Sequence, residues 1–112
     1  MKQVIAYIKP SALELVTEGL RSVEGMTGMS VVDIRGFGRG RGIIPSLINS
    51  QLTPFSRYVR LEIMASDAVV REVVDTIRQQ AWGGDKGEGK IYVLNVVEAV
   101  RVRTNERGEA AV

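Results

Sequence analysis

Glycine and basic residues gather in one short stretch, residues 83–90, with the sequence Gly-Gly-Asp-Lys-Gly-Glu-Gly-Lys. Glycine lets the backbone adopt positive φ angles and lets a ligand approach it closely. The stretch ends at Lys90, and Arg101 and Arg103 follow shortly. Exposed amides beside cations suit a polyphosphate ligand, and a flexible turn before a strand is the alternative interpretation. The P-loop pattern G-x-x-x-x-G-K-[ST] is excluded, because Ile91 follows Lys90.

A second glycine cluster covers residues 36–42, Gly-Phe-Gly-Arg-Gly-Arg-Gly. It is either a strand that bends into a loop or a second backbone segment that faces an anion. Residues 43–56 follow without clear periodicity, with two prolines among several large apolar side chains. Solvated loops are rarely so apolar. This long stretch therefore either folds back onto its own protein or docks onto a partner.

Composition excludes several classes of function. The 112 residues suit a single domain, and a hydrophobic fraction of 45% supports a core. The chain has no cysteine and no histidine, which rules out disulfides, thiolate chemistry and His-dependent catalysis. The net charge is only +2 and there is no basic tail, so nucleic-acid binding is not expected. The N-terminus has a strand pattern and no apolar run is long enough to span a membrane, which predicts a cytoplasmic protein.

The first part of the chain has the pattern strand, helix, strand. Residues 2–9 are nearly all apolar, as in a strand covered on both faces. Ser11 and Glu14 form a capping box that begins a helix, and Gly25 closes it in a left-handed conformation. Residues 31–35 continue as a strand. The buried stripe of the helix is expected at Leu13, Val16, Leu20 and Val23.

The second part repeats a strand and a helix. Residues 57–64 alternate as in a strand, and Ser66-Asp67 offers an N-cap for the helix that follows. Trp82 lies at the end of this helix, either as an aromatic at the edge of the core or as a platform for a stacked ligand. The buried positions are expected at Val59, Leu61 and Ile63 in the strand and at Val70, Val73, Ile77 and Ala81 in the helix.

The pattern from Ile91 to Arg103 predicts a long strand, on which Arg101 and Arg103 share one face about 7 Å apart. Two cations so close either meet an anion or are surface arginines balanced by nearby acids. The polar residues 104–112 are expected to form a flexible tail. The candidate acids are Glu98, Glu106 and Glu109.

The resulting order is strand, helix, strand, long loop, strand, helix, strand. Two βαβ halves joined in this way predict one α+β domain over residues 1–112, with a ferredoxin-like βαββαβ fold and an antiparallel four-stranded sheet. Two helices cover only one face of such a sheet. We therefore expect oligomerisation to cover the other face.

Several short motifs then match one family, in order and with matching spacing. They are Ile8-Lys9-Pro10, Thr27-Gly28-Met29-Ser30-Val31, Gly36-Phe37-Gly38-Arg39, Lys86-Gly87-Glu88-Gly89-Lys90-Ile91 and Arg101-Val102-Arg103-Thr104. Any one motif is weak, but together they are specific. Over nearly its whole length, the chain resembles the PII signal-transduction proteins.

The resemblance implies a homotrimer that binds ADP, AMP or ATP in the clefts between its subunits. A long loop, called the T-loop and expected at about 40–56, would contact a target enzyme or transporter. Membrane contact is then expected only through a transporter partner. The implied protein is a regulator and not an enzyme.

The resemblance also implies the residues of the nucleotide site. One group offers backbone and charge to the phosphates: Gly87, Glu88, Gly89 and Lys90. A second group would reach the same phosphates from the neighbouring subunit: Arg101 and Arg103. A third group would surround adenine and ribose: Gly28, Met29, Ser30, Met64, Gly36, Phe37, Gly38 and Arg39.

Some positions depart from the family pattern. Gly40 stands where most relatives have a glutamine that helps to hold magnesium-ATP and 2-oxoglutarate, and Tyr58 stands where they have a lysine. The loop has no tyrosine for uridylylation, and Glu88 replaces an aspartate of the same charge. Sensing of 2-oxoglutarate and uridylylation therefore do not carry over directly. Loss of the glutamine favours ADP or AMP over magnesium-ATP.

These departures predict a divergent branch, similar to the PII-like proteins associated with carboxysomes and bicarbonate transport. A small anion such as bicarbonate could lie against Arg39, Gly40 and Arg41. The predicted function is regulation of inorganic-carbon metabolism, and the alternative is a nitrogen-status regulator that senses ATP and 2-oxoglutarate. An ATPase, with Glu88 or Glu62 as base, and a purely structural trimer are further interpretations. No metal or other cofactor is expected, because the usual soft ligands are missing.

Overall fold

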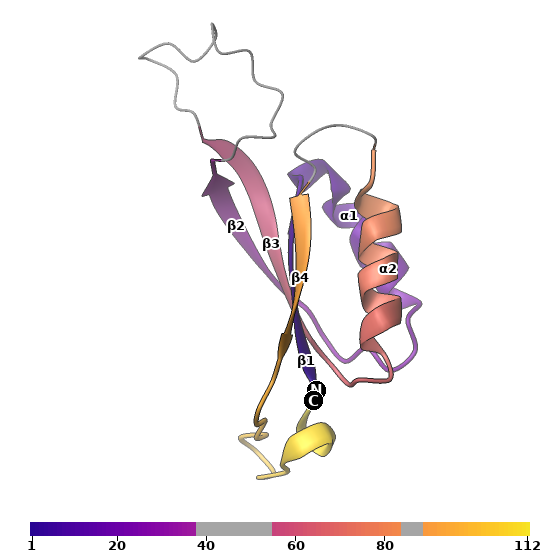
Figure 1. Ribbon diagram of the computed structural model, residues 1–112, viewed down its shortest axis with the longest axis vertical. Helices are drawn as coiled ribbons and strands as arrows, with labels where there is room; N and C mark the ends of the chain where they lie inside the picture. Colours follow the sequence, from indigo (N-terminus) through magenta and orange to yellow (C-terminus); the bar gives the residue numbers. More distant parts are fainter. Residues whose placement is uncertain (38–54, 84–88) are drawn as a thin grey trace, which may run out of the picture.

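The computed structural model describes residues 1–37, 55–83 and 89–112, and its strands and α-helices follow in the order β1, α1, β2, β3, α2, β4 (Figure 1). Residues 38–54 and 84–88, which include most of the predicted T-loop, lie outside the described residues. The strands are β1 Lys2–Ile8, β2 Ser30–Gly36, β3 Ser56–Ala65 and β4 Gly89–Asn95. The helices are α1 Leu13–Arg21 and α2 Val70–Ala81, with short 3₁₀ helices at Pro10–Ala12 and Gly108–Ala111.

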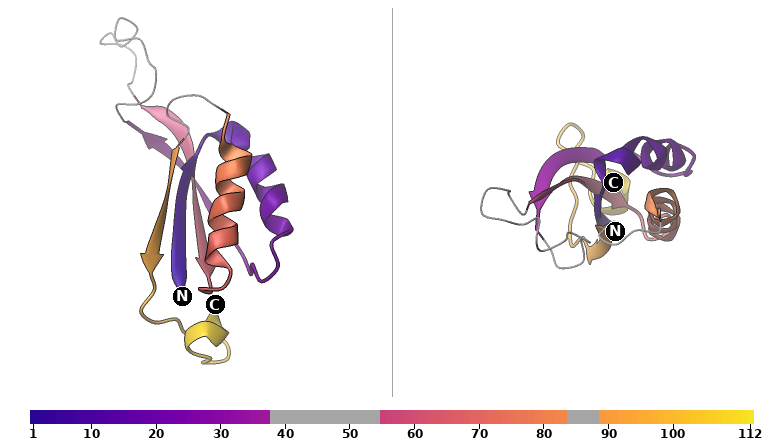
Figure 2. Two further views of the ribbon diagram at one scale, coloured as in Figure 1. Left: turned by 45° about the vertical axis from the view of Figure 1, so that its right-hand side comes forward. Right: turned by 90° about the horizontal axis from the view of Figure 1, so that it is seen from above.

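The four strands form one antiparallel sheet in the order β2-β3-β1-β4. Both helices pack on the same face of this sheet (Figure 2). This order and layering confirm the predicted α+β fold of the ferredoxin-like βαββαβ type.

The core lies between that face and the two helices. Alternate residues of the central strands are almost completely buried, as period-two patterning requires, and each helix contributes one stripe. The predicted alternation of β3 and the helical stripes around Val16 and Ile77 are confirmed. The fully buried side chains are Val4, Ala6 and Ile8 of β1, Val59, Leu61 and Ile63 of β3, Val16 and Leu20 of α1, and Val73 and Ile77 of α2.

Neither helix begins with the predicted side-chain cap. The N-cap of α1 is Ala12 and makes no side-chain cap hydrogen bond, because the 3₁₀ turn Pro10–Ala12 comes first and uses the Lys9 carbonyl. The N-cap of α2 is Val69, and the Ser66 backbone carbonyl accepts the amides of Val69 and Val70. The capping predictions were therefore wrong.

The end of the first helix was predicted more closely. Gly25 has a φ of +87°, the left-handed conformation expected of it. Helix α1, however, already ends at Arg21, and a short turn separates that residue from Gly25.

Strand β4 is shorter than predicted, because it ends at Asn95 and does not reach Arg103. The chain instead forms a turn, in which Val100 and Arg107 make an isolated antiparallel bridge and Asn105 has a φ of 61°. The Arg101 amide donates to the Glu106 carbonyl at 2.9 Å, and the Asn105 amide donates to the Arg101 carbonyl at 2.8 Å. These local bonds curl the backbone, so Arg101 and Arg103 do not share a strand face as predicted.

The last residues contact the start of β1. The Glu109 carboxylate lies 3.2 Å from the Met1 ammonium, which also lies 2.9 Å from Asp67. The hydrogen bonds and charges of these two acids raise the pKa of the Met1 ammonium, and the ammonium and Lys2 lower the pKa of Asp67. Residues 104–112 thus make specific contacts, and the flexibility predicted for them from their polarity stays a prediction.

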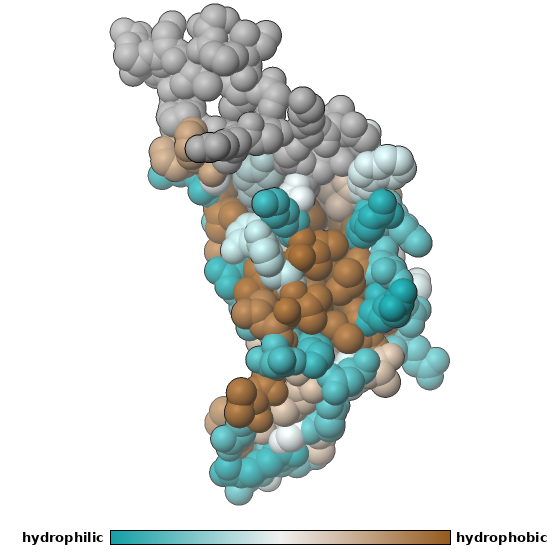
Figure 3. Space-filling view, viewed as in Figure 1, coloured by the Kyte–Doolittle hydropathy of each residue, from teal (hydrophilic) through white to brown (hydrophobic). Residues whose placement is uncertain are grey.

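The opposite face of the sheet is open, and it mixes aromatic, charged and aliphatic side chains. The rings of Tyr7 and Tyr92 meet edge to face at 6.2 Å, and Arg60 pairs with Glu62 at 2.9 Å. Figure 3 shows hydrophobic residues gathered over β4 and beside it. At this edge both faces are accessible, since Tyr92 is 49% exposed and its neighbour Val93 is 47% exposed. Among the described residues, no helix is both long and apolar enough to cross a membrane.

Helix α2 supplies a direct test of the packing. Ile77 is fully buried, so Ile77→Ala should lower the free energy of unfolding by about 3 kcal/mol through lost burial and the cavity left behind. Urea unfolding followed by circular dichroism, at one fixed protein concentration, measures the change. Leu15→Ala, at a position 59% exposed on α1, is the matched control and should change stability by less than about 0.5 kcal/mol. Equal losses in both variants would contradict this packing.

Candidate functional site

Some predicted site residues fall in the two stretches that the structure does not describe. They are Gly38, Arg39, Gly40 and Arg41 from the first stretch, and Gly87 and Glu88 from the second. The predictions for these residues lie outside the described residues. The remaining predicted residues divide into two groups, at different ends of the sheet.

Gly89 and Lys90 form the first two residues of β4, beside the end of β1. Gly89 has a φ of +118°, and a Cβ added to it would lie only 1.5 Å from the Tyr7 carbonyl oxygen. Glycine is therefore required at this position by β1 itself, before any ligand is considered. Lys90 pairs across the strands with Tyr7 and is exposed.

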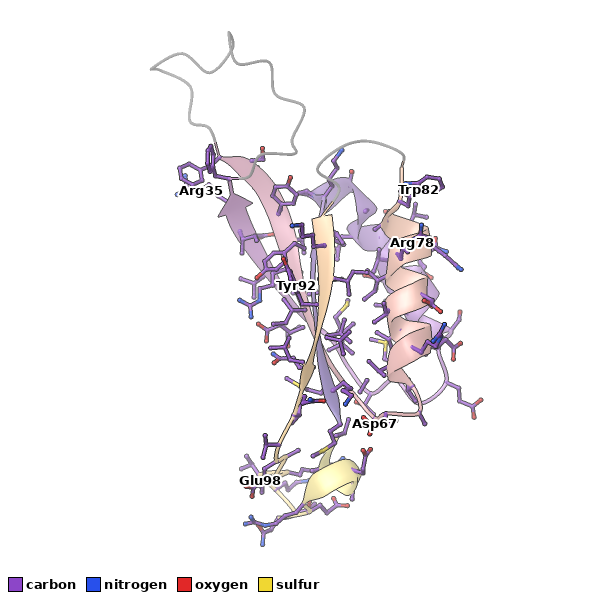
Figure 4. All side chains as sticks on the ribbon, viewed as in Figure 1. Arg35, Asp67, Arg78, Trp82, Tyr92 and Glu98 are labelled. Carbon is purple, nitrogen blue, oxygen red and sulfur yellow. The ribbon has the colours of Figure 1, made fainter. Side chains whose placement is uncertain are left out.

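A groove of about 350 Å³ runs between the C-terminal end of α2 and the start of β4. Its lining is mainly apolar, with Ile77 at its base and Lys90 at its side. Trp82 also lines the groove and is 68% exposed, and the Arg78 guanidinium lies 6.0 Å from its ring centroid. Figure 4 shows Arg78 and Trp82 together at this end of α2. The interpretation of Trp82 as an aromatic at the edge of the core was wrong, because most of its surface is accessible.

Gly36 and Phe37 lie at the corresponding end of β2. Gly36 pairs with Ser56 across the strands, and the ring of Tyr58 lies 3.3 Å from the position that a Gly36 Cβ would take. Phe37 is 66% exposed, and its ring centroid lies 6.2 Å from that of Phe55.

The second group lies toward the other end of the sheet. Gly28 and Met29 line a hollow of about 330 Å³ beside α1, and Gly28 borders open space. Ser30 begins β2 and pairs with Glu62, and Met64 lies two residues further along β3 with 42% of its surface exposed. Of the residues that the resemblance placed around adenine and ribose, Gly28, Met29, Ser30 and Met64 thus lie toward this end of the sheet, whereas Gly36 and Phe37 lie at the other end.

Arg101 and Arg103 lie beyond this same end, in the turn that follows β4. The Arg101 guanidinium is 3.2 Å from the Glu106 carboxylate and 3.3 Å from the Ala110 carbonyl oxygen. One of the acids proposed to balance the arginines, Glu106, therefore does so for Arg101. Arg103 is exposed and makes no ion pair within the described part of the chain. The other two candidate acids have different partners, with Glu98 on Arg107 and Glu109 on Met1.

The two groups are too far apart for one small ligand to reach both within one chain. Met64 pairs with Gln3, near the start of β1, whereas Gly89 pairs with Ile8 at its end. Five residue steps along a strand separate these levels, which is about 16 Å at the usual rise. Arg101 and Arg103 lie still further from Gly89, beyond the end of β4 (Figure 1). A cleft between two copies of the chain would let both groups contact one ligand.

Sequence reasoning did not single out Tyr7 or Arg78. Tyr7 sits in an apolar run, and only the strand register places it opposite Lys90. Arg78 lies one helical turn before Trp82 on α2, and this spacing of four residues is the signal that could have predicted their contact.

Comparisons with known proteins identify the family of the chain. Residues 1–106 match the family model of the nitrogen regulatory protein P-II. The P-II of Klebsiella oxytoca and the P-II 1 of Escherichia coli K12 are each 40% identical to this chain, over the full length of both proteins. The crystal structure of Arabidopsis thaliana PII bound to citrate superimposes with a TM-score of 0.79 and 34% identity, and covers 99% of this chain and 91% of that one.

The fold and the two groups of site residues therefore define a small ferredoxin-like α+β protein with the strand order and glycine-rich segments of a signalling regulator. The chain belongs to the P-II family.

Gly89 provides a test of the geometry at the start of β4. Gly89→Ala should lower the free energy of unfolding by more than about 2 kcal/mol, because the new Cβ collides with the Tyr7 carbonyl and the backbone has a positive φ. Gly108→Ala is the control, since Gly108 also has a positive φ (+70°) but open space around it, and it should cost about 1 kcal/mol. Urea unfolding measures both. A smaller loss for Gly89→Ala than for the control would show that β4 does not begin against β1 in this way.

Proposed function

We propose that this protein is a regulator that binds an adenine nucleotide between the subunits of a homotrimer and acts on a partner protein through its T-loop. The observation that carries the proposal is the separation of the two groups of site residues. Gly89 and Lys90 lie at one end of the sheet, and Met64, Arg101 and Arg103 lie at or beyond the other. A cleft between two copies is the arrangement that lets both groups meet one nucleotide.

The open face of the sheet supports the assembly. Ile5, Tyr7 and Tyr92 are accessible there in one chain, and burying them between copies removes apolar surface from water. Arg60 and Glu62 pair on the same face, and the Arg60 Nε is buried without a hydrogen-bond partner in the described structure. A closed ring of copies covers such a face on every subunit, whereas an open chain of copies leaves one face exposed.

The partner is proposed to be a target enzyme or transporter that the T-loop, at about 40–56, contacts directly. Its base is described, and there the aromatic pair Phe37 and Phe55 joins the ends of β2 and β3. Nucleotide binding can change partner affinity only if it favours one arrangement of the loop over another. Gly36 and Phe37, which continue from β2 toward the loop, are the described residues through which a nucleotide in the cleft could do so.

ADP or AMP is the proposed ligand, with ATP as a weaker one and bicarbonate as a second effector near Arg39, Gly40 and Arg41. Tyr58 supports this choice. Its ring packs beside Gly36, and by the resemblance it replaces a lysine of the relatives that would contact 2-oxoglutarate. The function would then belong to inorganic-carbon metabolism. The second candidate is nitrogen-status control with ATP and 2-oxoglutarate, and it is favoured by the relatives, which are called nitrogen regulatory proteins. In both cases the protein regulates and does not catalyse.

Calorimetric titration separates these two candidates. ATP, ADP and AMP are each titrated into the protein, with magnesium and with either 2-oxoglutarate or bicarbonate. We expect ADP or AMP to bind more tightly than ATP, with affinities that bicarbonate changes and 2-oxoglutarate does not. ATP binding that tightens with 2-oxoglutarate would instead assign the protein to nitrogen control. Failure of all three nucleotides to bind would overturn the proposed function.

Subunit mixing tests the location of the nucleotide. Lys90→Ala and Arg103→Ala should each weaken nucleotide binding by about tenfold, because each removes a cation from the phosphates. When the two variants are unfolded together and refolded, some clefts combine the Lys90 of one chain with the Arg103 of another. Those clefts should recover the original affinity in the same calorimetric assay.

The control for mixing is Arg71→Ala, which removes an exposed arginine of α2 that pairs with Asp75 and is not among the predicted site residues. It should bind nucleotide normally, alone and in mixtures. If mixed Lys90→Ala and Arg103→Ala chains never recover tight binding, the site does not lie between subunits in the proposed way.

A further inference from the structure

Two arginines lie directly opposite each other at the base of the T-loop. Arg35 of β2 and Arg57 of β3 are cross-strand partners in the antiparallel register, which sets their Cβ atoms about 5 Å apart on one face of the sheet. Both are exposed. Figure 4 shows Arg35 near the end of β2, next to the segment that leads into the loop.

Like charges in directly opposite positions destabilise a strand pair. Within the described residues, neither arginine makes an ion pair. Asp33 lies on the same face, but it is opposite Val59 and one alternate position further down β2. The chain thus keeps a repulsive pair at a position where a single change to a neutral residue would remove the repulsion.

The intervening sequence supplies no acid either. Between Asp33 and Glu62 the chain has no aspartate or glutamate, and its only charged residues there are arginines. The rest of the chain has ten basic residues against thirteen acidic ones. Positive charge is therefore concentrated in this stretch of the sequence, and the rest of the chain is slightly acidic. The five arginines are Arg35, Arg39, Arg41, Arg57 and Arg60.

Two exposed aromatic side chains stand beside the arginine pair. Phe37 lies two residues after Arg35 and is 66% exposed, and Phe55 lies two residues before Arg57 and is 52% exposed. Arginine and aromatic residues are the types most enriched where proteins bind each other tightly. The four side chains together form a patch that offers bidentate donors next to apolar surface.

We propose that this patch, Arg35, Arg57, Phe37 and Phe55, binds an acidic segment of the partner protein, in which carboxylates flank an apolar or aromatic side chain. The inference rests on the proposed role in controlling a partner and gives that partner a chemistry. A carboxylate between the two guanidinium groups replaces their repulsion with two charge-assisted contacts. The phenylalanines favour a protein segment over a nucleic acid or a membrane. The acidic remainder of the chain would also repel the phosphates of a nucleic acid or of an anionic membrane.

The test uses the full chain and a fluorescein-labelled synthetic peptide of repeated Glu-Phe-Glu units separated by glycine. Its counterpart has glutamine in place of every glutamate. Fluorescence anisotropy should show that the full chain binds the acidic peptide at least about tenfold more tightly than the glutamine peptide, and that added salt reduces the difference. The double variant Arg35→Gln/Arg57→Gln should lose about tenfold or more of the affinity.

A matched control removes the same charge elsewhere. Arg21→Gln/Arg71→Gln changes two exposed helical arginines, whose ion pairs with Glu18 and Asp75 are solvent-exposed, and it should keep the affinity within about twofold. Arg57→Glu adds a readout on folding. It should abolish peptide binding while raising the melting temperature, because it turns the repulsive pair into an attractive one.

Four results would overturn the inference. The first is equal affinity for the two peptides, and the second is an equal loss of peptide affinity in the double variant and its control. The third is binding only of the competing probes, an oligothymidylate or phosphatidylserine vesicles. The fourth is a change of oligomeric state in the double variant, measured by sedimentation. The last result would place the arginine pair between copies of the chain. Calorimetry with nucleotide on the same samples keeps this test separate from the proposed function. If the chain binds the acidic peptide normally but binds no nucleotide, only the proposed function is overturned.

Discussion

The pairing of β1 with β3 on one side and β4 on the other is the constraint on which the rest of the structure depends. It fixes Gly89 and Lys90 at the end of β1, and it fixes Met64 and the last residues of β4 near its beginning. The predicted nucleotide-site residues therefore lie at opposite ends of the sheet. If both groups contact one nucleotide, as proposed, the site draws on two copies of the chain, and assembly and ligand binding are linked.

The same pairing explains an otherwise costly glycine. At Gly89 the backbone of β4 approaches the Tyr7 carbonyl so closely that no side chain fits. The glycine-rich stretch that first suggested an anion site thus has a steric reason at one of its positions, independent of any ligand. Gly84 and Gly87 of the same stretch lie outside the described residues, so the binding hypothesis rests on the sequence pattern, on Lys90 and on the family.

The surfaces on the two sides and at the loop end of the sheet differ in composition and burial. One face is closed by α1 and α2 and holds the core. The opposite face and the β4 edge keep aromatic and aliphatic residues accessible, as expected of a subunit that buries them against other copies. The loop end carries arginines and phenylalanines in place of either pattern. A surface of that composition is poorly suited to a core and well suited to a second protein.

Much of this protein was determined by the sequence alone. The periodicities around Val16, Leu61 and Ile77 and the order of elements were sufficient for the fold, because burial imposes a period of two on strands and near four on helices. The motifs were sufficient for the family. The helix caps and the end of β4 were missed. A 3₁₀ turn at Pro10 and local hydrogen bonds around Asn105 replace the expected cap and strand, and the residue pattern alone does not show that these alternatives are more stable.

Only the tertiary structure decided strand register, and register decided the rest. It placed Tyr7 against Lys90, Arg35 against Arg57, and Met64 far from Gly89. None of these relations follows from residue types, since sliding one strand by two positions keeps every side chain on its face and preserves the hydrophobic pattern. The sequence therefore specifies which residues can bind, and the pairing of the strands specifies which of them can do so together.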